Sequence, residues 1–388
     1  MEELLRDLER RSSSAIAMMG RRGVDYLALT PSPNFRYLAG FSEDTHERVM
    51  LLILTSGGEK VLIAPRLANI PGWVSSSIDV VLWGDEDSVS GVIDRIAKRL
   101  RIHGRRAAFE DSMSFRVYTM LRDILAPSSV SLASEILGDL RMRKSLYEIR
   151  VIMRAVRAAE RVFEEIYKIL TPGLSERFIA SQVSSIVASE GFDEAFRSIV
   201  AFGENTANPH HIPGDRKLSR GDLVLVDLGV VVDGYISDLT RMFSLGPLSR
   251  DARDRFSCLM SCFSEALSMI SPGVRASEID LRVRSCLSEY GFGENILHRT
   301  GHGIGIEVHE PPYISINSDH VLDRGNVFTI EPGIYFRGFY GLRVESNIAI
   351  LDNGDVIVLD KISRAVSYTH LRAHETPEHL VCRLLLEK

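Results

Sequence analysis

Hydrophobic positions divide the chain into two parts with different periodicity. In the first third, short apolar runs at residues 25–30 and 49–64 alternate with polar turns, one of which is Gly57-Gly58. A helical pattern follows at residues 88–102. Short apolar runs bounded by turn residues are typical of strands, whereas apolar residues three or four apart indicate a helix. The pattern predicts a small mixed α/β domain.

A long helical pattern separates this domain from the rest of the chain. Leu146, Ile149 and Ile152 have helical spacing with charged residues between them, and the pattern covers residues 137–170 almost without a break. We expect a domain boundary near residues 136–146. This boundary separates an N-terminal domain at residues 1–140 from a second domain at residues 141–364.

The second domain contains an internal repeat. The segments I-L-T-P-G, ending at Gly173, and M-I-S-P-G, ending at Gly273, are each followed at equal spacing by a second glycine, Gly191 or Gly291. In each copy one helix stops at Pro-Gly, and a second helix is capped by the later glycine. The repeat indicates two related α/β halves, and a site between them could draw ligands from both.

Charge and composition narrow the possible partners. The net charge of -6 provides no basic surface for nucleic acid or anionic lipid. The longest apolar runs have the length of strands, and residues 1–11 are charged throughout, unlike a secretory signal. We therefore expect a cytoplasmic protein without nucleic-acid or membrane partners.

Cysteine usage agrees with a reducing compartment. The four cysteines are too few for a disulfide framework in so long a chain, and none forms a C-x-x-C pair. We interpret the first three as apolar helix residues. The four are Cys258, Cys262, Cys286 and Cys382.

The end of the chain has no clear period. The letters T-H-L-R-A-H-E-T at residues 369–376 resemble translated adapter sequence, so we interpret residues 365–388 as a non-native or disordered tail. A genuine helical tail is the alternative, which the apolar residues at 380–386 would support.

One strand pattern of the buried type contains a carboxylate. Asp227 lies inside the apolar run G-D-L-V-L-V-D-L-G, where an unpaired charge would cost several kcal/mol and a metal would satisfy it. Asp233-Gly234 predicts a two-residue hairpin turn, which places Asp238 opposite Gly229 and makes Asp227 and Asp238 diagonal neighbours on one face. The alternative is a strand-end aspartate pair held by backbone donors or by Arg241.

Charged residues in other predicted strands and in a glycine-rich segment are further candidate metal ligands. Glu331 lies in T-I-E-P-G, and Glu345 shares one strand face with Arg343 in L-R-V-E-S. His302, in the glycine-flanked R-T-G-H-G-I-G, is followed by His309, and these glycines would let the backbone approach a metal or substrate closely. A phosphate loop is disfavoured because its lysine is absent. We interpret three other histidines as surface or satisfied core residues: His46, His103 and His298.

The candidate ligands form a hard, oxygen-rich set. Four carboxylates and one imidazole suit Mn, Co or Fe better than a structural zinc site. Carboxylates can bridge two ions, and such a pair, roughly 3.5 to 4 Å apart, can hold a hydroxide at neutral pH and polarise a carbonyl. The residues therefore favour hydrolysis.

These motifs resemble those of the pita-bread metallopeptidases, which include Xaa-Pro dipeptidase (prolidase), aminopeptidase P, methionine aminopeptidase and the metal-free creatinase. The letters N-F-R-Y-L-A-G-F at residues 34–41 are similar to the creatinase/prolidase N-terminal domain, which argues against methionine aminopeptidase. The resemblance implies an α/β (α+β) protein with a creatinase/prolidase-like N-terminal domain followed by a pseudo-two-fold pita-bread catalytic domain. It also implies two divalent metal ions, Mn or Co first and Fe or Zn as alternatives, held by Asp227, Asp238, His302, Glu331 and Glu345.

The resemblance assigns further roles. His210, in A-N-P-H-H-I-P, matches the substrate-side histidine of the family, and His309 matches the second one. It implies that Glu331 shuttles the proton, that both histidines bind or stabilise the tetrahedral oxyanion, and that Arg343 orients Glu345 or contacts substrate.

Two positions next to these motifs stand outside them. His211 is interpreted as structural or solvent-facing. Ser346 stands where many relatives have a carboxylate after the last ligand. This difference affects the surroundings of the metal ligands and not metal binding itself.

The expected function is hydrolysis of Xaa-Pro bonds in small peptides by an Xaa-Pro dipeptidase, with an Xaa-Pro aminopeptidase (aminopeptidase P) as the alternative. A non-catalytic pita-bread binding protein and a metal-free creatine-type amidinohydrolase both conflict with an intact ligand set. The resemblance further implies a homodimer.

Overall fold

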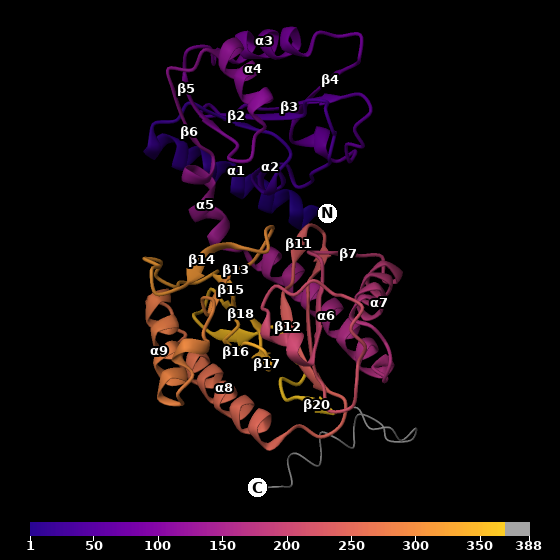
Figure 1. Cartoon of the computed structure of the whole chain (residues 1–388). Coiled ribbons are helices and arrows are strands. Elements are labelled where there is room, and N and C mark those ends of the chain that lie inside the picture. The colour runs from indigo at the N-terminus through magenta and orange to yellow at the C-terminus, as the bar shows by residue number, and fades with distance from the viewer. Residues whose placement is uncertain (369–388) are drawn as a thin grey trace.

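The computed structural model describes residues 1–368 as two domains, one above the other in Figure 1. Of the predicted tail at residues 365–388, residues 369–388 lie outside the described part of the chain. Within residues 1–368, no helix combines the length and the apolar character that a membrane crossing requires.

The N-terminal domain is built on one mixed sheet with the strand order β4-β3-β2-β1-β5-β6. Strand β2 runs antiparallel to β1 and β3, whereas β5 is parallel to β1 and β6. Its helices are α1 (Glu2–Arg22), α2 (Pro33–Ala39), η1 (Val74–Ser76), α3 (Val89–Leu100), α4 (Phe115–Leu125) and α5 (Ser134–Met142). Its strands are β1 (Tyr26–Leu29), β2 (Leu51–Thr55), β3 (Lys60–Pro65), β4 (Asp79–Trp83), β5 (Arg106–Phe109) and β6 (Ser129–Leu132).

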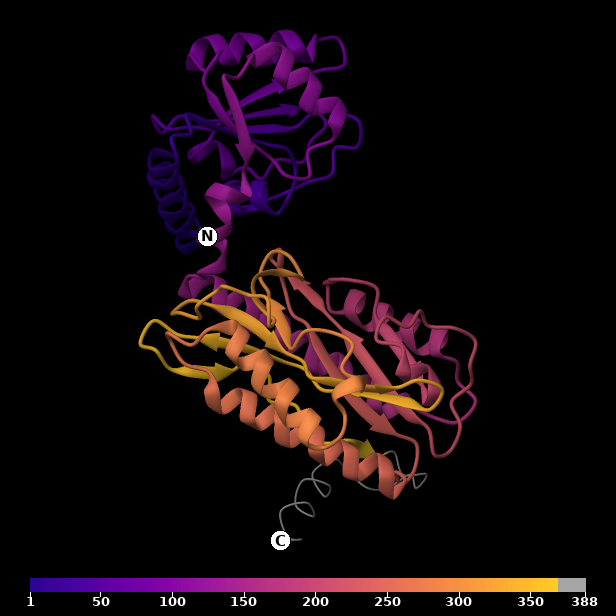
Figure 2. The same cartoon turned by 60° about the vertical axis from the view of Figure 1, so that its left-hand side comes forward.

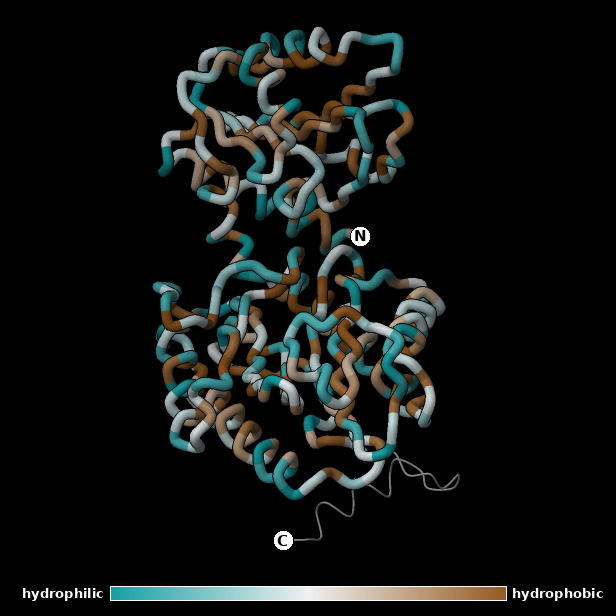
Figure 3. Tube along the Cα trace, viewed as in Figure 1, coloured by the Kyte–Doolittle hydropathy of each residue, from teal (hydrophilic) through white to brown (hydrophobic). Residues whose placement is uncertain are grey.

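Alternation of side chains along the strands gives this sheet two buried faces. Leu27 and Leu29 pack in one apolar cluster with α1, α2 and α5, whereas Tyr26 and Ala28 pack in another with α3 and α4. Strand β1 in the middle of the sheet is therefore apolar and buried along its whole length, and Figure 3 shows hydrophobic segments inside the domain.

The predicted near-continuous helix at residues 137–170 is wrong in one respect. Helix α5 ends at Met142, and α6 (Leu146–Ile169) begins after three intervening residues. Ser145 starts α6 with a capping box, in which its hydroxyl accepts the Glu148 N–H at 3.2 Å and its own N–H donates to the Glu148 carboxylate at 2.9 Å. Hydrophobic periodicity continues across such a cap, so the pattern did not reveal the break.

The C-terminal domain contains two helix pairs and several small sheets. The sheet orders are β20-β12-β9-β8, β14-β13-β15-β18-β19, β11-β10-β7 and β16-β17. Its helices are α6, α7 (Glu176–Ser189), η2 (Gly203–Ala207), α8 (Arg250–Met269), α9 (Ala276–Glu289) and η3 (Gly293–Asn295). Its strands are β7 (Asp193–Glu194), β8 (Ile199–Phe202), β9 (Leu223–Leu228), β10 (Val230–Val232), β11 (Tyr235–Ile236), β12 (Leu239–Ser244), β13 (Gly301–Gly303), β14 (Glu310–Ile314), β15 (Val327–Ile330), β16 (Gly333–Phe336), β17 (Tyr340–Arg343), β18 (Ser346–Ile350), β19 (Val356–Val358) and β20 (Ser367–Tyr368).

The internal repeat corresponds to two equivalent structural halves. Helices α6 and α7 cover the strands from one side, and α8 and α9 cover them from the other (Figure 2). The turn glycines make equivalent bonds, since the Gly173 N–H donates to Leu218 O at 2.9 Å and the Gly273 N–H donates to Leu322 O at 2.8 Å. This is the pseudo-two-fold pita-bread arrangement predicted from the sequence.

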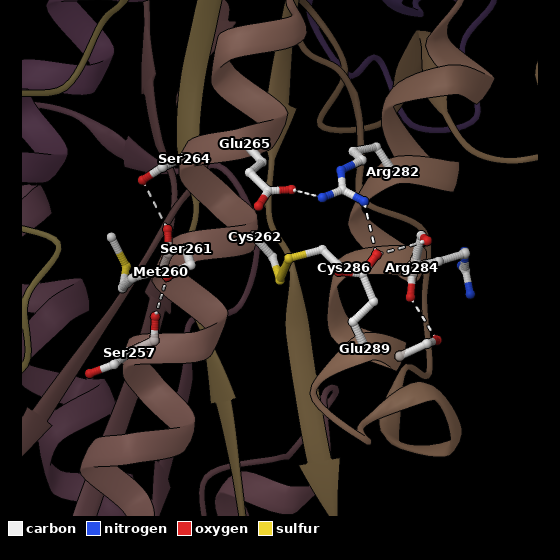
Figure 4. The surroundings of a disulfide bond; sticks show 12 residues. Ser257, Met260, Ser261, Cys262, Ser264, Glu265, Arg282, Arg284, Cys286 and Glu289 are labelled. Atoms are coloured by element: carbon white, nitrogen blue, oxygen red, sulfur yellow. Dashed lines mark hydrogen bonds and ion pairs between the residues drawn. A yellow bond between two sulfur atoms is a disulfide. The ribbon is translucent and has the colours of Figure 1, made fainter.

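A disulfide joins the second helix pair, which the sequence interpretation did not expect. Cys262 of α8 and Cys286 of α9 are both buried and bonded, with their Cα atoms 5.7 Å apart (Figure 4). Their interpretation as apolar helix residues gave the correct elements but missed the bond. The two positions meet only because α8 and α9 pack side by side. The Arg282 guanidinium crosses the same pair of helices, 2.6 Å from the Glu265 carboxylate.

Buried ion pairs connect the two domains. The Glu310 carboxylate of β14 accepts hydrogen bonds from the Lys144 ammonium and the Arg141 guanidinium, each at 2.6 Å. Lys144 and Glu310 are almost fully buried, and Arg141 also donates to the Asn34 side chain of α2 at 2.9 Å. Burial alone would raise the pKa of Glu310, but the two cations reverse that effect and lower it.

We predict that Glu310→Gln lowers the free energy of unfolding by about 3 kcal/mol, because the substitution leaves a buried ammonium and a buried guanidinium without their shared carboxylate. Urea denaturation followed by circular dichroism measures the change. The matched control is Asp215→Asn, which removes an exposed ion pair with Arg177 and should leave the stability almost unchanged. Equal effects of the two substitutions would contradict the importance of burial.

Candidate metal centre

A hairpin positions the two aspartates. Strands β9 and β12 pair with Leu228 opposite Leu239, and the turn at Asp233-Gly234 puts Val232 opposite Tyr235, as the turn chemistry predicted. Asp233 has φ 49° and Gly234 has φ 80°, the left-handed conformations that such a two-residue turn requires. In this register Asp227 lies in β9 and Asp238 immediately precedes β12, and both are buried.

The other three candidate ligands come from the second half of the domain. His302 lies in β13, Glu331 follows β15, and Glu345 lies between β17 and β18. Ligand atoms lie within 4.8 Å of one another in three overlapping groups. The groups are Asp227, Asp238 and Glu345; His302, Glu331 and Glu345; and Asp238, His302 and His309. The structure therefore brings all five residues together, with His309 at the edge.

The ring of His302 is held in a defined orientation. Its Nδ1 lies 3.2 Å from Gly303 O, which can only accept, so Nδ1 carries the proton. Nε2 then presents its lone pair to the carboxylates, 3.3 Å from Glu331 Oε1 and 3.7 Å from Asp238 Oδ2. Burial lowers the pKa of His302 to about 3, so the ring stays neutral. This is the tautomer that a metal-binding histidine requires.

Arg343 lies behind the carboxylates and is fully engaged by its neighbours. Its guanidinium donates to the Asp227 carboxylate, to the Thr240 hydroxyl at 3.0 Å and to the Tyr335 hydroxyl at 3.0 Å. Thr240 in turn donates to the Glu345 carboxylate at 2.9 Å. Arg343 thus orients Asp227 directly and Glu345 through Thr240.

The histidines at the rim of the centre are less buried. The His309 ring meets the His302 ring edge to face, with centroids 4.2 Å apart, whereas His210 is exposed at the end of the loop after η2. Burial lowers the pKa of His309, and the neighbouring Arg299 and His210 lower it further. Both predicted histidines therefore lie at the open side of the ligand cluster.

Repulsion among the carboxylates is strong. Burial, and then the charge of Glu345, raises the pKa of Asp238 well above its ordinary value. Burial, and then the charge of Glu331, does the same to Glu345. Burial also raises the pKa of Glu331 to about 7, although Arg343 opposes this change. Like charges gathered in a buried site favour protonation unless a cation neutralises them.

Comparison with known proteins agrees with this arrangement. Residues 150–352 match metallopeptidase family M24. The chain belongs to metallopeptidase family M24. Residues 11–143 match the Creatinase/Prolidase N-terminal domain, so both parts of the chain are accounted for by known families.

Individual M24 relatives cover nearly the whole chain. The probable dipeptidase PepE of Mycobacterium tuberculosis is 36% identical over 90% of this chain and 93% of its own length. The crystal structure of a prolidase from Thermococcus sibiricus superposes with a TM-score of 0.86 at 34% identity, over 94% of this chain and 99% of that one. The X-Pro aminopeptidase of Thermotoga maritima gives a TM-score of 0.81 at 27% identity, over 89% and 98% of the two chains.

The ligand cluster of this M24 chain fits divalent metal ions. Oδ1 of Asp227 is buried and has no hydrogen-bond partner among the described residues, although Oδ2 is held by Arg343. An orphaned carboxylate oxygen beside raised carboxyl pKa values indicates that a cation belongs there. Oxygen-rich sets with one imidazole suit Mn, Co or Fe.

Residues next to the predicted ligands hold the loops of the M24 site. His211 Nε2 lies 2.7 Å from the fully buried Glu176 carboxylate, which fixes the loop that carries His210. Ser346 accepts a hydrogen bond from Arg364 at 2.7 Å and donates to Asp360 at 3.1 Å. A hydroxyl at position 346 therefore joins a network behind Glu345 instead of adding another charge.

Sequence reasoning missed several supporting residues. Thr240 lies two residues after Asp238, so its place beside that aspartate was a usable signal. Tyr335 lies four residues after Glu331 and bonds Arg343 across the β16–β17 pair, so its place near the ligands was also a usable signal. Asp280 carried no such signal, because it reaches the site across the fold. Asp280 is fully buried on α9 and accepts from the Thr300 N–H at 3.0 Å and from the Ile316 N–H at 2.8 Å. His298, interpreted as a satisfied residue, lies 2.8 Å from the Tyr335 hydroxyl.

We predict that the stability of the metal-free protein depends on pH through the protonation of the Glu331 carboxyl. Its folded pKa of about 7 lies above the ordinary value of 4.5, so its stabilising contribution is fully present below pH 4.5 and is lost as the pH rises through 7. Metal-free wild type should therefore lose stability relative to Glu331→Gln between about pH 5 and pH 8. Urea denaturation at each pH gives the difference.

At about pH 8, saturating Mn²⁺ should make wild type more stable than Glu331→Gln, because the ion stabilises the charged carboxylate and the glutamine cannot replace it. A difference that does not change with pH would contradict the raised pKa.

Proposed function

We propose that this M24 peptidase is a metal-dependent Xaa-Pro dipeptidase that uses two divalent metal ions, Mn or Co in preference to Fe or Zn. The observation that carries the proposal is the convergence of Asp227, Asp238, His302, Glu331 and Glu345 in overlapping groups of ligand atoms. Similarity to proteins named dipeptidase and prolidase, over nearly the whole chain, supports the substrate class.

The bound ions would lower the pKa of a water molecule and polarise the scissile carbonyl. The chain supplies the remaining functions. Glu331 accepts and returns the proton, the role that the resemblance to the family implies. His210 and His309, on the open side, stabilise charge that develops on the carbonyl oxygen. Arg343 keeps Asp227 in position by a direct ion pair.

The choice between dipeptidase and aminopeptidase P depends on the length of the substrate. The relatives include both a prolidase and an X-Pro aminopeptidase, so the fold alone does not separate them. We favour the dipeptidase because of the similarity to PepE. The homodimer stays a prediction from the family resemblance.

Functions without metal chemistry fit this site less well. A non-catalytic binding protein or a metal-free amidinohydrolase has no need for four carboxylates around one imidazole. Such carboxylates, buried and mutually repelling, destabilise the fold unless they bind cations. The intact set therefore favours a metallopeptidase.

We predict that purified protein cleaves Ala-Pro only when metal is present. Chelation should reduce the release of proline at least about 100-fold, and Mn²⁺ or Co²⁺ should restore it, because the ions activate water. Proline release is measured with Ala-Pro and with Ala-Pro-Ala, using each of Mn, Co, Zn and Fe. Cleavage of Ala-Pro-Ala alone would identify an aminopeptidase P, and activity insensitive to chelation would overturn the metal-dependent proposal.

We also predict that Asp238→Asn lowers the metal content from two ions per chain toward one or none. The substitution removes a charge from a buried site while preserving the shape of the side chain. Isothermal titration with Mn²⁺ and elemental analysis measure the stoichiometry. The control Asp123→Asn changes an exposed aspartate on α4 and should leave two ions bound. Unchanged metal content in Asp238→Asn would remove this residue from the proposed ligands.

A further inference from the structure

Arg299 lies on the ligand side of the β13–β14 pair. Its guanidinium carbon is 4.5 Å from the centre of the Tyr313 ring. Tyr313 of β14 is the cross-strand partner of His302, and directly opposed residues of an antiparallel pair project from the same face of a sheet. The guanidinium therefore lies on the face from which His302 reaches the other candidate ligands.

The charge of Arg299 is not neutralised by the described part of the chain. Within residues 1–368, no carboxylate forms an ion pair with it, and its stacking on Tyr313 is the contact that holds it. Other arginines around the site already form ion pairs. Arg343 pairs with Asp227, and Arg284 pairs with Asp280 at 2.8 Å. Stacking on a ring fixes the guanidinium plane while its edge donors stay free for a planar anion.

Arg299 lies close to the ligand cluster, because it precedes His302 by three residues and its guanidinium stacks on the cross-strand partner of that histidine. The carboxylate ligands thus form an acidic floor, whereas Arg299 is a positive charge at the rim. A substrate with an electrophilic carbonyl over the floor and an anionic group at the rim would match both.

We propose that Arg299 binds a carboxylate of the peptide substrate. A guanidinium can hold a carboxylate through two parallel hydrogen bonds, which also fixes its orientation. Two carboxylates have the required chemistry: the C-terminal carboxylate that every Xaa-Pro dipeptide carries, and the side chain of an acidic Xaa residue. The proposal rests on the proposed peptidase function and adds a specificity-determining residue to it.

Steady-state kinetics with four substrates tests the proposal in Mn²⁺-loaded protein. Ala-Pro and Ala-Pro-amide differ only in the C-terminal charge, and Glu-Pro and Gln-Pro differ only in the side-chain charge. Each is assayed with wild type, Arg299→Gln and Arg299→Lys. Arg282→Gln on α9 is the matched control, since it removes an arginine far from the ligand cluster whose partner is Glu265.

We expect Arg299→Gln to raise KM for the charged member of one pair at least about tenfold, because charge-assisted hydrogen bonds are lost. The neutral member and kcat should change little, and Arg299→Lys should restore part of the loss. If the C-terminal carboxylate is the bound group, proline should inhibit Arg299→Gln more weakly than it inhibits wild type. Inhibition by prolinamide should not differ between the two proteins. A loss confined to Glu-Pro relative to Gln-Pro would identify the acidic side chain as the bound group.

The proposal is overturned if Arg299→Gln affects all four substrates equally, or none of them, while wild type remains active. In that case the peptidase function stands and only the role of Arg299 fails. Wild-type protein that binds Mn²⁺ but cleaves none of the four substrates would instead overturn the proposed function, on which this inference rests.

Discussion

Mutual repulsion of buried carboxylates is the constraint around which this structure is organised. Asp227, Asp238, Glu331 and Glu345 meet where solvent cannot screen them, and burial with neighbouring charge raises the pKa of Asp238 and Glu345. The arrangement is favourable only with cations between the carboxylates, so the same repulsion that weakens the metal-free fold creates affinity for metal. Rigid support follows from this need, because a displaced ligand leaves a buried charge unpaired. Arg343 supplies part of that support.

The two halves of the C-terminal domain support the site in a similar way. In each half, the second helix of the pair contributes one fully buried carboxylate to the loops beside the ligands. Glu176 of α7 accepts from the Phe202 N–H at 2.9 Å and holds the loop of His210. Asp280 of α9 holds the backbone of Thr300, two residues before His302. Duplication therefore explains how rigid anchors reach both sides of one centre.

The N-terminal domain contributes to the same rigidity from a distance. Arg141 and Lys144, at the junction of the domains, bind Glu310, the residue after His309. A buried ion pair of this kind stabilises little by comparison with apolar packing, but it fixes the position of the groups it joins. The domain contact thus connects the fold of the first 142 residues with the segment that carries two of the histidines.

The sequence by itself determined the local features of this protein. Asp233-Gly234 dictated the hairpin register, and hence the diagonal placement of Asp227 and Asp238, because turn geometry and side-chain alternation are short-range. The motifs around the other ligands indicated the metal chemistry. Only the tertiary structure decided the bond between Cys262 and Cys286 and the anchors that reach across the fold. Such contacts join residues far apart in the chain, and no local periodicity encodes which distant side chain a residue will meet.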